Sequence, residues 1–170
     1  MTALITAIIG LLIAIGAYFY YDNYIANPPA GMPAPLEAED SLMEPALMTV
    51  NRSGQNLTKM PKDILSMTRL QQLDLSNNKI TGALPAEIRH LSNLEVLNIS
   101  NNTMTGLPAE LGQLSKLRIL NAANNQLTGI PHELGNLQQL EILDLSGNDI
   151  SESDLNIIRE RLPASTRIIL

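Results

Sequence analysis

The sequence that decides the fold is LEVLNISNNTMTGLP, residues 94–108, because the chain repeats its pattern. Leucine or isoleucine occupies positions one, four and six of this segment, asparagine position nine, glycine position thirteen and proline position fifteen. The pattern returns at residues 117–131, starts at residue 70 with one extra residue before its proline, and starts again at residue 140. A looser copy begins at residue 47. Such a period predicts stacked units that bury their apolar sides against one another.

This sequence pattern resembles the leucine-rich repeats of plant receptor-like proteins and of bacterial surface proteins, over about residues 47–150. The resemblance implies an α/β fold: a leucine-rich repeat solenoid with a short parallel sheet on its concave face. Family members generally bind proteins, peptides or surface ligands on that face. Plant and animal ectodomains of the family usually carry cysteine-paired caps, whereas this chain has no cysteine. That difference favours a small bacterial protein.

Each repeat contains a short strand followed by a turn. Alternating apolar residues predict strands that send two side chains inward, at Leu73 and Leu75, Leu97 and Ile99, Leu120 and Ala122, and Leu143 and Leu145. An asparagine follows each pair and is expected to bond backbone groups at the bend: Asn78, Asn102, Asn125 and Asn148. The glycines at 82, 106 and 129 are expected to adopt angles that a side chain forbids. After each proline, apolar residues three apart predict a helical turn on the convex side.

Both ends of the repeat domain, residues 47–170, depart from the pattern. Arg52 stands at an inward strand position of the first coil, which predicts an N-terminal cap whose arginine reaches water. Near the other end, Ser151 or Ser153 is expected to cap a helix that runs to about Leu162. Residues 166–170 are expected to add a final strand to the sheet. The domain is therefore predicted to end in a helix-strand cap.

The N-terminal region differs sharply from the repeats. Residues 1–24 hold a nearly continuous apolar run and all five aromatic residues of the chain, which predicts one transmembrane helix with tyrosines at the headgroup interface. A cleaved signal peptide and a buried helix of a soluble protein are the alternatives. Residues 25–46 are rich in proline and acidic residues and contain no basic residue, which is typical of a semi-rigid linker.

Membrane orientation rests on one argument. No lysine or arginine occurs before Arg52, so the positive-inside rule has nothing to count near the predicted helix. A short N-terminus before a single span more often stays in the cytoplasm. We therefore expect a single-pass membrane protein whose signal-anchor holds the repeat domain outside the cytoplasm.

Outward-facing strand residues form the candidate binding site on the concave face. Strand alternation gives two columns across the central repeats, one of them ending in three β-branched residues beside a column of amides and carboxylates. The candidate residues are Gln72, Asp74, Val96, Asn98, Ile119, Asn121, Ile142 and Asp144. The alternative is that β-branched residues stand there because they suit strands. A third column, of serines with one alanine, follows the second.

Composition limits the function classes. Five of the 17 acidic residues lie in residues 1–46, which leaves 12 against 11 lysines and arginines in the repeat domain, too balanced for nucleic acid. His90 and His132 are expected on the convex side as exposed loop residues, more than a repeat apart and with no cysteine to join them. We therefore expect no enzyme, metal or cofactor.

Two function classes follow from these observations. The favoured one is a membrane-anchored module that binds a protein or peptide ligand; the alternative is a structural or scaffolding membrane protein, which could face the cytoplasm as an adaptor. Neither the identity of the ligand nor the oligomeric state follows from the sequence.

Overall fold

The computed structural model of this protein describes residues 48–170. The predicted anchor, residues 1–24, and the predicted linker, residues 25–46, lie outside the described residues. Among residues 48–170, no helix has the length and apolar character needed to cross a bilayer.

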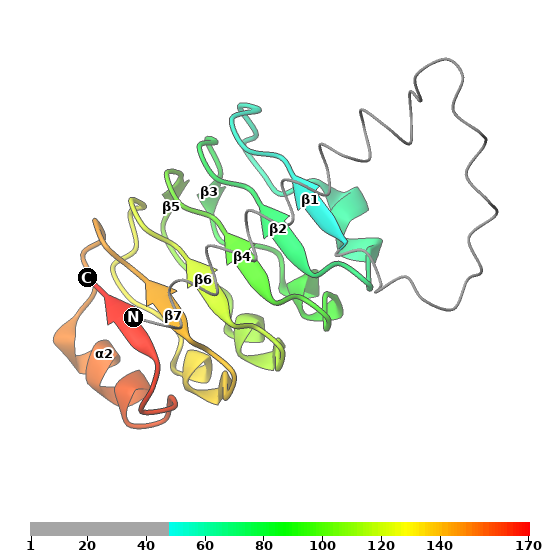
Figure 1. Cartoon of the computed structure of the whole chain (residues 1–170). Coiled ribbons are helices and arrows are strands. Elements are labelled where there is room, and N and C mark those ends of the chain that lie inside the picture. The colour runs from blue at the N-terminus through cyan, green and yellow to red at the C-terminus, as the bar shows by residue number, and fades with distance from the viewer. Residues whose placement is uncertain (1–47) are drawn as a thin grey trace, which may run out of the picture. The chain divides into compact units, whose positions relative to one another are not determined.

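The repeats stack into a right-to-left series of coils in Figure 1, each contributing one strand to a parallel sheet of six strands. The strands, in spatial order, are β1 (Thr49–Asn51), β2 (Gln72–Asp74), β4 (Val96–Asn98), β6 (Ile119–Asn121), β7 (Ile142–Asp144) and β8 (Arg167–Ile169). The predicted parallel sheet and its final strand are thus confirmed. Each strand pairs with the next in the same register, so that Val96 aligns with Ile119 and Ile119 with Ile142.

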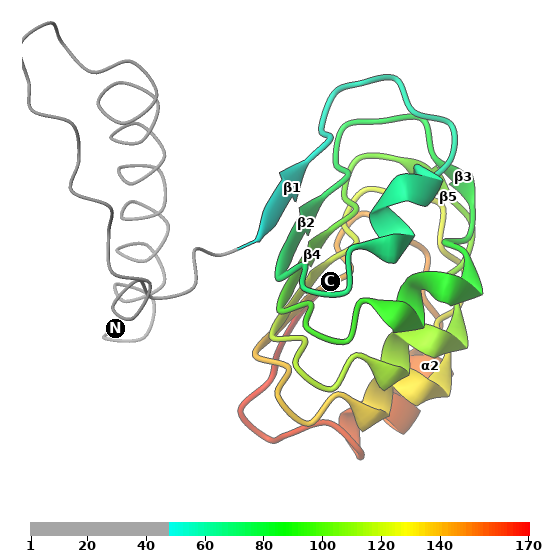
Figure 2. The same ribbon diagram turned by 90° about the vertical axis from the view of Figure 1, so that its right-hand side faces the viewer.

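Four 3₁₀ helices line the opposite side of the coils, as Figure 2 shows in a view along the stack. They are η2 (Lys62–Ser66), η3 (Ala86–His90), η4 (Ala109–Gln113) and η5 (His132–Asn136). Each begins directly after an extended proline, and each buries the isoleucine or leucine at its third position. The three-residue spacing in the sequence matches the period of a 3₁₀ helix, so the predicted helical turns are confirmed.

A second, smaller sheet joins two neighbouring coils between the strand and the 3₁₀ helix. It consists of β3 (Thr81–Gly82) and β5 (Thr103–Met104), paired in parallel. This sheet was not predicted from the sequence. The extra residue of this repeat, Ala83, follows β3 and is exposed, so the insertion lies at the surface and does not disturb the core.

Apolar side chains from strands and 3₁₀ helices fill the space between the two sides. The predicted inward residues of β2 to β7 are at most 1% exposed. A ladder of buried asparagines accompanies this core: the Oδ1 atom of Asn102 accepts from the backbone N–H of Ile80, and its Nδ2 donates to the carbonyls of Leu75, Ile99 and Ser100. Asn78, Asn125 and Asn148 repeat this arrangement in their own coils. The predicted structural role of these asparagines is confirmed.

The prediction for the glycines is wrong at two positions. Gly82 has a φ of +74°, but Gly106 and Gly129 are not among the residues with positive φ. The left-handed conformation falls instead on Asn77, Asn101 and Asn124, directly before the ladder asparagines. The sharp turn therefore comes immediately after the strand, where asparagine tolerates positive φ, and Gly106 and Gly129 do not need a positive φ.

Both ends differ from the central coils. Arg52 keeps 40% of its side chain exposed and lies 3.9 Å from Asp63, so it reaches water as expected of a capping coil. At the other end, α2 (Glu152–Arg159) begins after Ser151, whose hydroxyl accepts from the backbone N–H of Asp154 at 3.2 Å. Ser151, and not Ser153, is the cap. The helix ends before Leu162, although that side chain is still buried.

Candidate binding face

The outer face of the six-stranded sheet carries two columns of side chains. The first column contains Thr49, Gln72, Val96, Ile119, Ile142 and Arg167. Its third to fifth residues, Val96, Ile119 and Ile142, are partly exposed, although they are β-branched and apolar. Since the register of β4, β6 and β7 is uniform, these three side chains form a continuous apolar strip.

The second column contains Asn51, Asp74, Asn98, Asn121, Asp144 and Ile169. Its asparagines and aspartates make one recurring internal bond, in which Oδ1 accepts the backbone N–H two residues further on. The acceptors Asp74, Asn98, Asn121 and Asp144 lie 2.8 to 3.2 Å from those N–H groups. The column therefore holds the chain where each strand ends, a structural role that the sequence analysis did not assign to it.

This internal bond fixes what the second column presents to a partner. Because Oδ1 of Asn98 and Asn121 faces the backbone, the Nδ2 group of each amide points away from that bond, and no hydrogen bond of Nδ2 to residues 48–170 is found. By the same geometry, the second carboxylate oxygen of Asp74 and Asp144 is left for solvent. The order across the sheet is carboxylate, amide donor, amide donor, carboxylate.

Most of the third column is buried and offers little to a partner. Ser76, Ser100 and Ala123 are buried. The hydroxyls of Ser100 and Ser146 donate to the aspartate or asparagine of their own repeat at 2.8 and 2.7 Å. The accessible face therefore consists of the first two columns, which contain all eight predicted site residues, each of them partly exposed.

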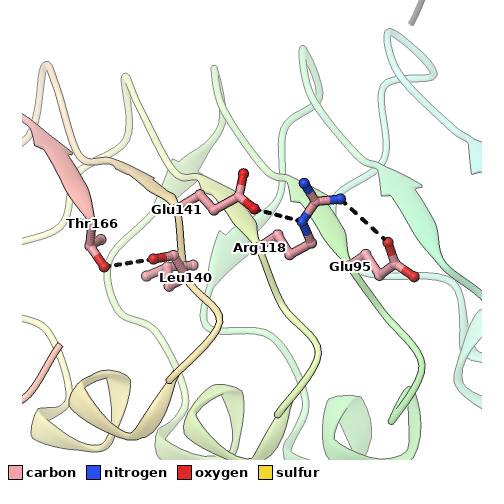
Figure 3. A network of polar contacts seen from close by, with 5 residues as sticks. All are labelled: Glu95, Arg118, Leu140, Glu141 and Thr166. Carbon is pink, nitrogen blue, oxygen red and sulfur yellow. Dashed lines mark hydrogen bonds and ion pairs between the residues drawn. The ribbon is translucent and has the colours of Figure 1, made fainter. Parts of the chain in front are cut away.

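The residues directly before the first column in the chain include a row of charged side chains, which Figure 3 shows. Arg118 donates through Nε to Oε1 of Glu141 at 2.9 Å, and its Nη1 lies 3.9 Å from Oε2 of Glu95. The hydrogen bond to Glu141, with the charges of both glutamates, raises the pKa of Arg118 against the opposing effect of partial burial. Further along the row, the hydroxyl of Thr166 donates to the carbonyl of Leu140 at 2.6 Å.

This row was not predicted from the sequence as a border of the site. A signal was present, because Glu95, Arg118 and Glu141 occupy the same position of successive repeats with alternating charge. Residues at equivalent repeat positions become neighbours across strands about 4.8 Å apart, where opposite charges attract.

The two histidines lie far from these columns. His90 and His132 are exposed on η3 and η5, so their expected convex position is confirmed, but they belong to 3₁₀ helices and not to loops. Nε2 of His132 lies 3.7 Å from Oδ1 of Asp154. Within residues 48–170, no group of three or more histidine, cysteine, aspartate or glutamate side chains is arranged to hold a metal.

Comparison with known proteins identifies the family. A family model described as a leucine-rich repeat region matches residues 47–162. The chain belongs to the leucine-rich repeat family. Over 81 residues it is 42% identical to Receptor-like protein 18 of Arabidopsis thaliana, an alignment that covers 48% of this chain and 9% of that protein.

Solved leucine-rich repeat structures share the fold. A leucine-rich repeat protein of Leptospira interrogans is 43% identical with a TM-score of 0.62, over 66% of this chain and 28% of that one. The plant peptide hormone receptor RGFR1, solved in complex with RGF2, is 33% identical with a TM-score of 0.58, over 72% of this chain and 21% of that one. This repeat chain therefore spans less than a third of each of these relatives.

Proposed function

We propose that this leucine-rich repeat chain is a membrane-anchored module that binds a protein or peptide through the first two columns of its sheet. The observation that carries the proposal is the partly exposed apolar strip of Val96, Ile119 and Ile142, in register beside a column of polar groups. An apolar strip next to oriented polar groups is typical of binding surfaces. The peptide complex of the related hormone receptor supports the same class of ligand.

We expect a single copy of the chain to bind its ligand weakly through this face. Tryptophan and tyrosine, which dominate binding energy in many interfaces, do not occur after residue 24. We therefore expect a monovalent dissociation constant of about 1 μM or above, with stronger capture when several copies share one membrane. Catalysis forms no part of the proposal.

The test is to pan a phage-displayed library of random dodecapeptides on the immobilised full-length chain. Replacing Val96, Ile119 and Ile142 together by threonine keeps β-branched strand residues while it removes apolar surface. We expect this variant to lose capture of the peptides that the parent chain enriches.

A matched control replaces three exposed residues of the convex side, His90, Gln113 and Glu133, by threonine. This control is expected to bind like the parent. The opposite pattern, with capture lost in the convex variant and kept in the sheet variant, would refute binding by the sheet face and support the scaffolding alternative.

The membrane anchor is a second part of the proposal. The apolar run within residues 1–24 supports a single span, and the similarity to a plant receptor-like protein supports repeats outside the cytoplasm. Because the chain has no cysteine, Gln113→Cys places one thiol at an exposed site of η4. Labelling of intact cells by a membrane-impermeant maleimide is expected. Labelling that requires lysis, with the chain in the membrane fraction, would contradict this orientation.

A further inference from the structure

The polar groups of the second column are arranged symmetrically about the centre of the sheet. Asp74 and Asp144 lie on β2 and β7, and Asn98 and Asn121 lie on the two strands between them. All four side chains are oriented by the bond from Oδ1 to their own backbone, so the outward groups are two amide donors flanked by two carboxylates. A partner must therefore offer acceptors at the middle and positive charge at both ends.

From this arrangement we infer the chemical class of the ligand: an extended peptide that crosses the strands and carries a lysine or arginine four residues from a second one. The inference rests on the proposed function, because it uses the same two columns. It adds the order of ligand side chains, which the proposed function leaves open.

The spacing comes from sheet geometry. Three intervals of about 4.8 Å separate β2 from β7, so the two carboxylates are about 14 Å apart. Four residues of an extended peptide span about 13 Å, at about 3.3 Å per residue. Basic side chains at positions one and five of such a segment can therefore reach Asp74 and Asp144 together.

Alternation of the peptide completes the fit. In an extended segment, side chains at positions two and four point to the side opposite those at one and five. When the basic residues face the second column, positions two and four lie over the strip of Val96, Ile119 and Ile142, which favours aliphatic residues there. Carbonyls of the peptide that point to the sheet accept from Nδ2 of Asn98 and Asn121.

The negative charge of the binding face favours a basic ligand. It disfavours the N-terminal part of this chain as the segment that binds there. Residues 1–46 contain five acidic side chains and no lysine or arginine, so they cannot supply the cations. The face and the charged row beside it carry four carboxylates, Asp74, Glu95, Glu141 and Asp144, against two arginines. Arg118 is already paired with two glutamates, and Arg167 lies on the edge strand β8, so the face is acidic.

The test uses a fluorescein-labelled peptide, Ser-Lys-Val-Thr-Val-Lys-Ser, and the purified full-length chain in detergent micelles, with binding followed by fluorescence anisotropy. One control peptide replaces both lysines by glutamate. The other has the same composition but places the two lysines next to each other. We expect the spaced lysine peptide to bind most tightly of the three.

Two isosteric variants separate the contributions of charge and donors. Asp74→Asn with Asp144→Asn keeps the internal Oδ1 bonds, and asparagine already occurs at this position of other repeats. We expect it to weaken the spaced lysine peptide by about fivefold to tenfold, since each half-exposed ion pair contributes a few-fold. The reverse pair, Asn98→Asp with Asn121→Asp, adds negative charge but removes the donors, and it is also expected to weaken binding.

Each contrary outcome has a definite meaning. Equal behaviour of the three peptides, including no binding by any, overturns the inference, as does an unchanged lysine preference in the Asp74→Asn, Asp144→Asn variant. Tighter binding by Asn98→Asp, Asn121→Asp also overturns it, because charge alone would then explain the result. If the library still yields peptides whose capture depends on the apolar strip, the proposed function stands while this inference fails. If it yields none, the proposed function fails first.

Discussion

Replacing Asn102 by leucine removes one member of the asparagine ladder from the centre of the repeat stack. Asn102 is 8% exposed, and its amide forms four hydrogen bonds. Its Oδ1 accepts from the backbone N–H of Ile80 at 2.9 Å. Its Nδ2 group donates to the carbonyls of Leu75 and Ile99 at 3.0 Å, and to that of Ser100 at 3.2 Å.

The cost of the change can be worked out group by group. The three carbonyls each keep another donor, either a neighbouring ladder asparagine or a backbone N–H. The N–H of Ile80 has no such replacement and becomes a buried unpaired donor, which costs about 1–3 kcal/mol. Losing the two N–H bonds of the amide adds about 1 kcal/mol each. We therefore expect Asn102→Leu to lower the free energy of unfolding by about 3–5 kcal/mol.

The assay is a urea titration of the full-length chain in detergent, followed by far-ultraviolet circular dichroism. Asn156→Leu on the exposed face of α2 serves as the control, because its amide accepts only a 3.4 Å contact from Arg159. This control is expected to change stability by less than about 0.5 kcal/mol. The dependence of unfolding free energy on urea should keep its slope in both variants, so that the midpoint reports stability.

An Asn102→Leu midpoint close to that of the parent would refute the reasoning. It would mean that the N–H of Ile80 finds water or another acceptor, and that the ladder contributes little beyond the apolar core. A change of slope would instead show that the repeats no longer unfold together.

Three further changes test other features of the fold, each measured by the same titration. Gly112→Ala should lower the free energy of unfolding by about 1–3 kcal/mol because the added methyl overlaps the backbone carbonyl of Glu133, whereas Gly106→Ala, with open space and no positive φ, should be neutral or slightly stabilising. Ser151→Ala should cost about 1 kcal/mol by removing the cap of α2, and no loss would show that the end of the helix is held by packing alone. Arg118→Met should cost less than about 1 kcal/mol, since the arginine is half exposed; a larger loss would mean that its two glutamates depend on it.

The sequence predicted the features that recur at the same position of every repeat. The strand leucines, the ladder asparagines and the three-residue apolar spacing after each proline are such features, and their roles were predicted, although the ladder asparagines also bond to the preceding coil. The parallel sheet between coils was predicted too, but two other contacts between coils were missed. The pairing of β3 with β5 and the contacts of Arg118 with two flanking coils arise only on stacking.

The sequence predicted where the candidate site residues lie on the strands, but not how their side-chain polar groups are oriented. Strand alternation was enough to place Val96, Ile119 and Ile142 on the outer face, and the register of the strands agrees with it. The sequence could not show that the amide of Asn98 turns its oxygen to the backbone, because this depends on the chain direction after the strand. The same turn gives Asn101 the positive φ, which was expected at Gly106.

The uniform register makes the coils interchangeable units at the level of the gene. An in-phase duplication of residues 117–139 would insert a complete coil, and every inward leucine and ladder asparagine after it would meet an equivalent neighbour. The outer face would gain one strand, about 4.8 Å, without redesign of the rest. Recombination between the repeat copies in the gene can therefore change the width of the sheet by whole strands. A duplication that is out of phase with the repeat would instead bring polar residues into the core.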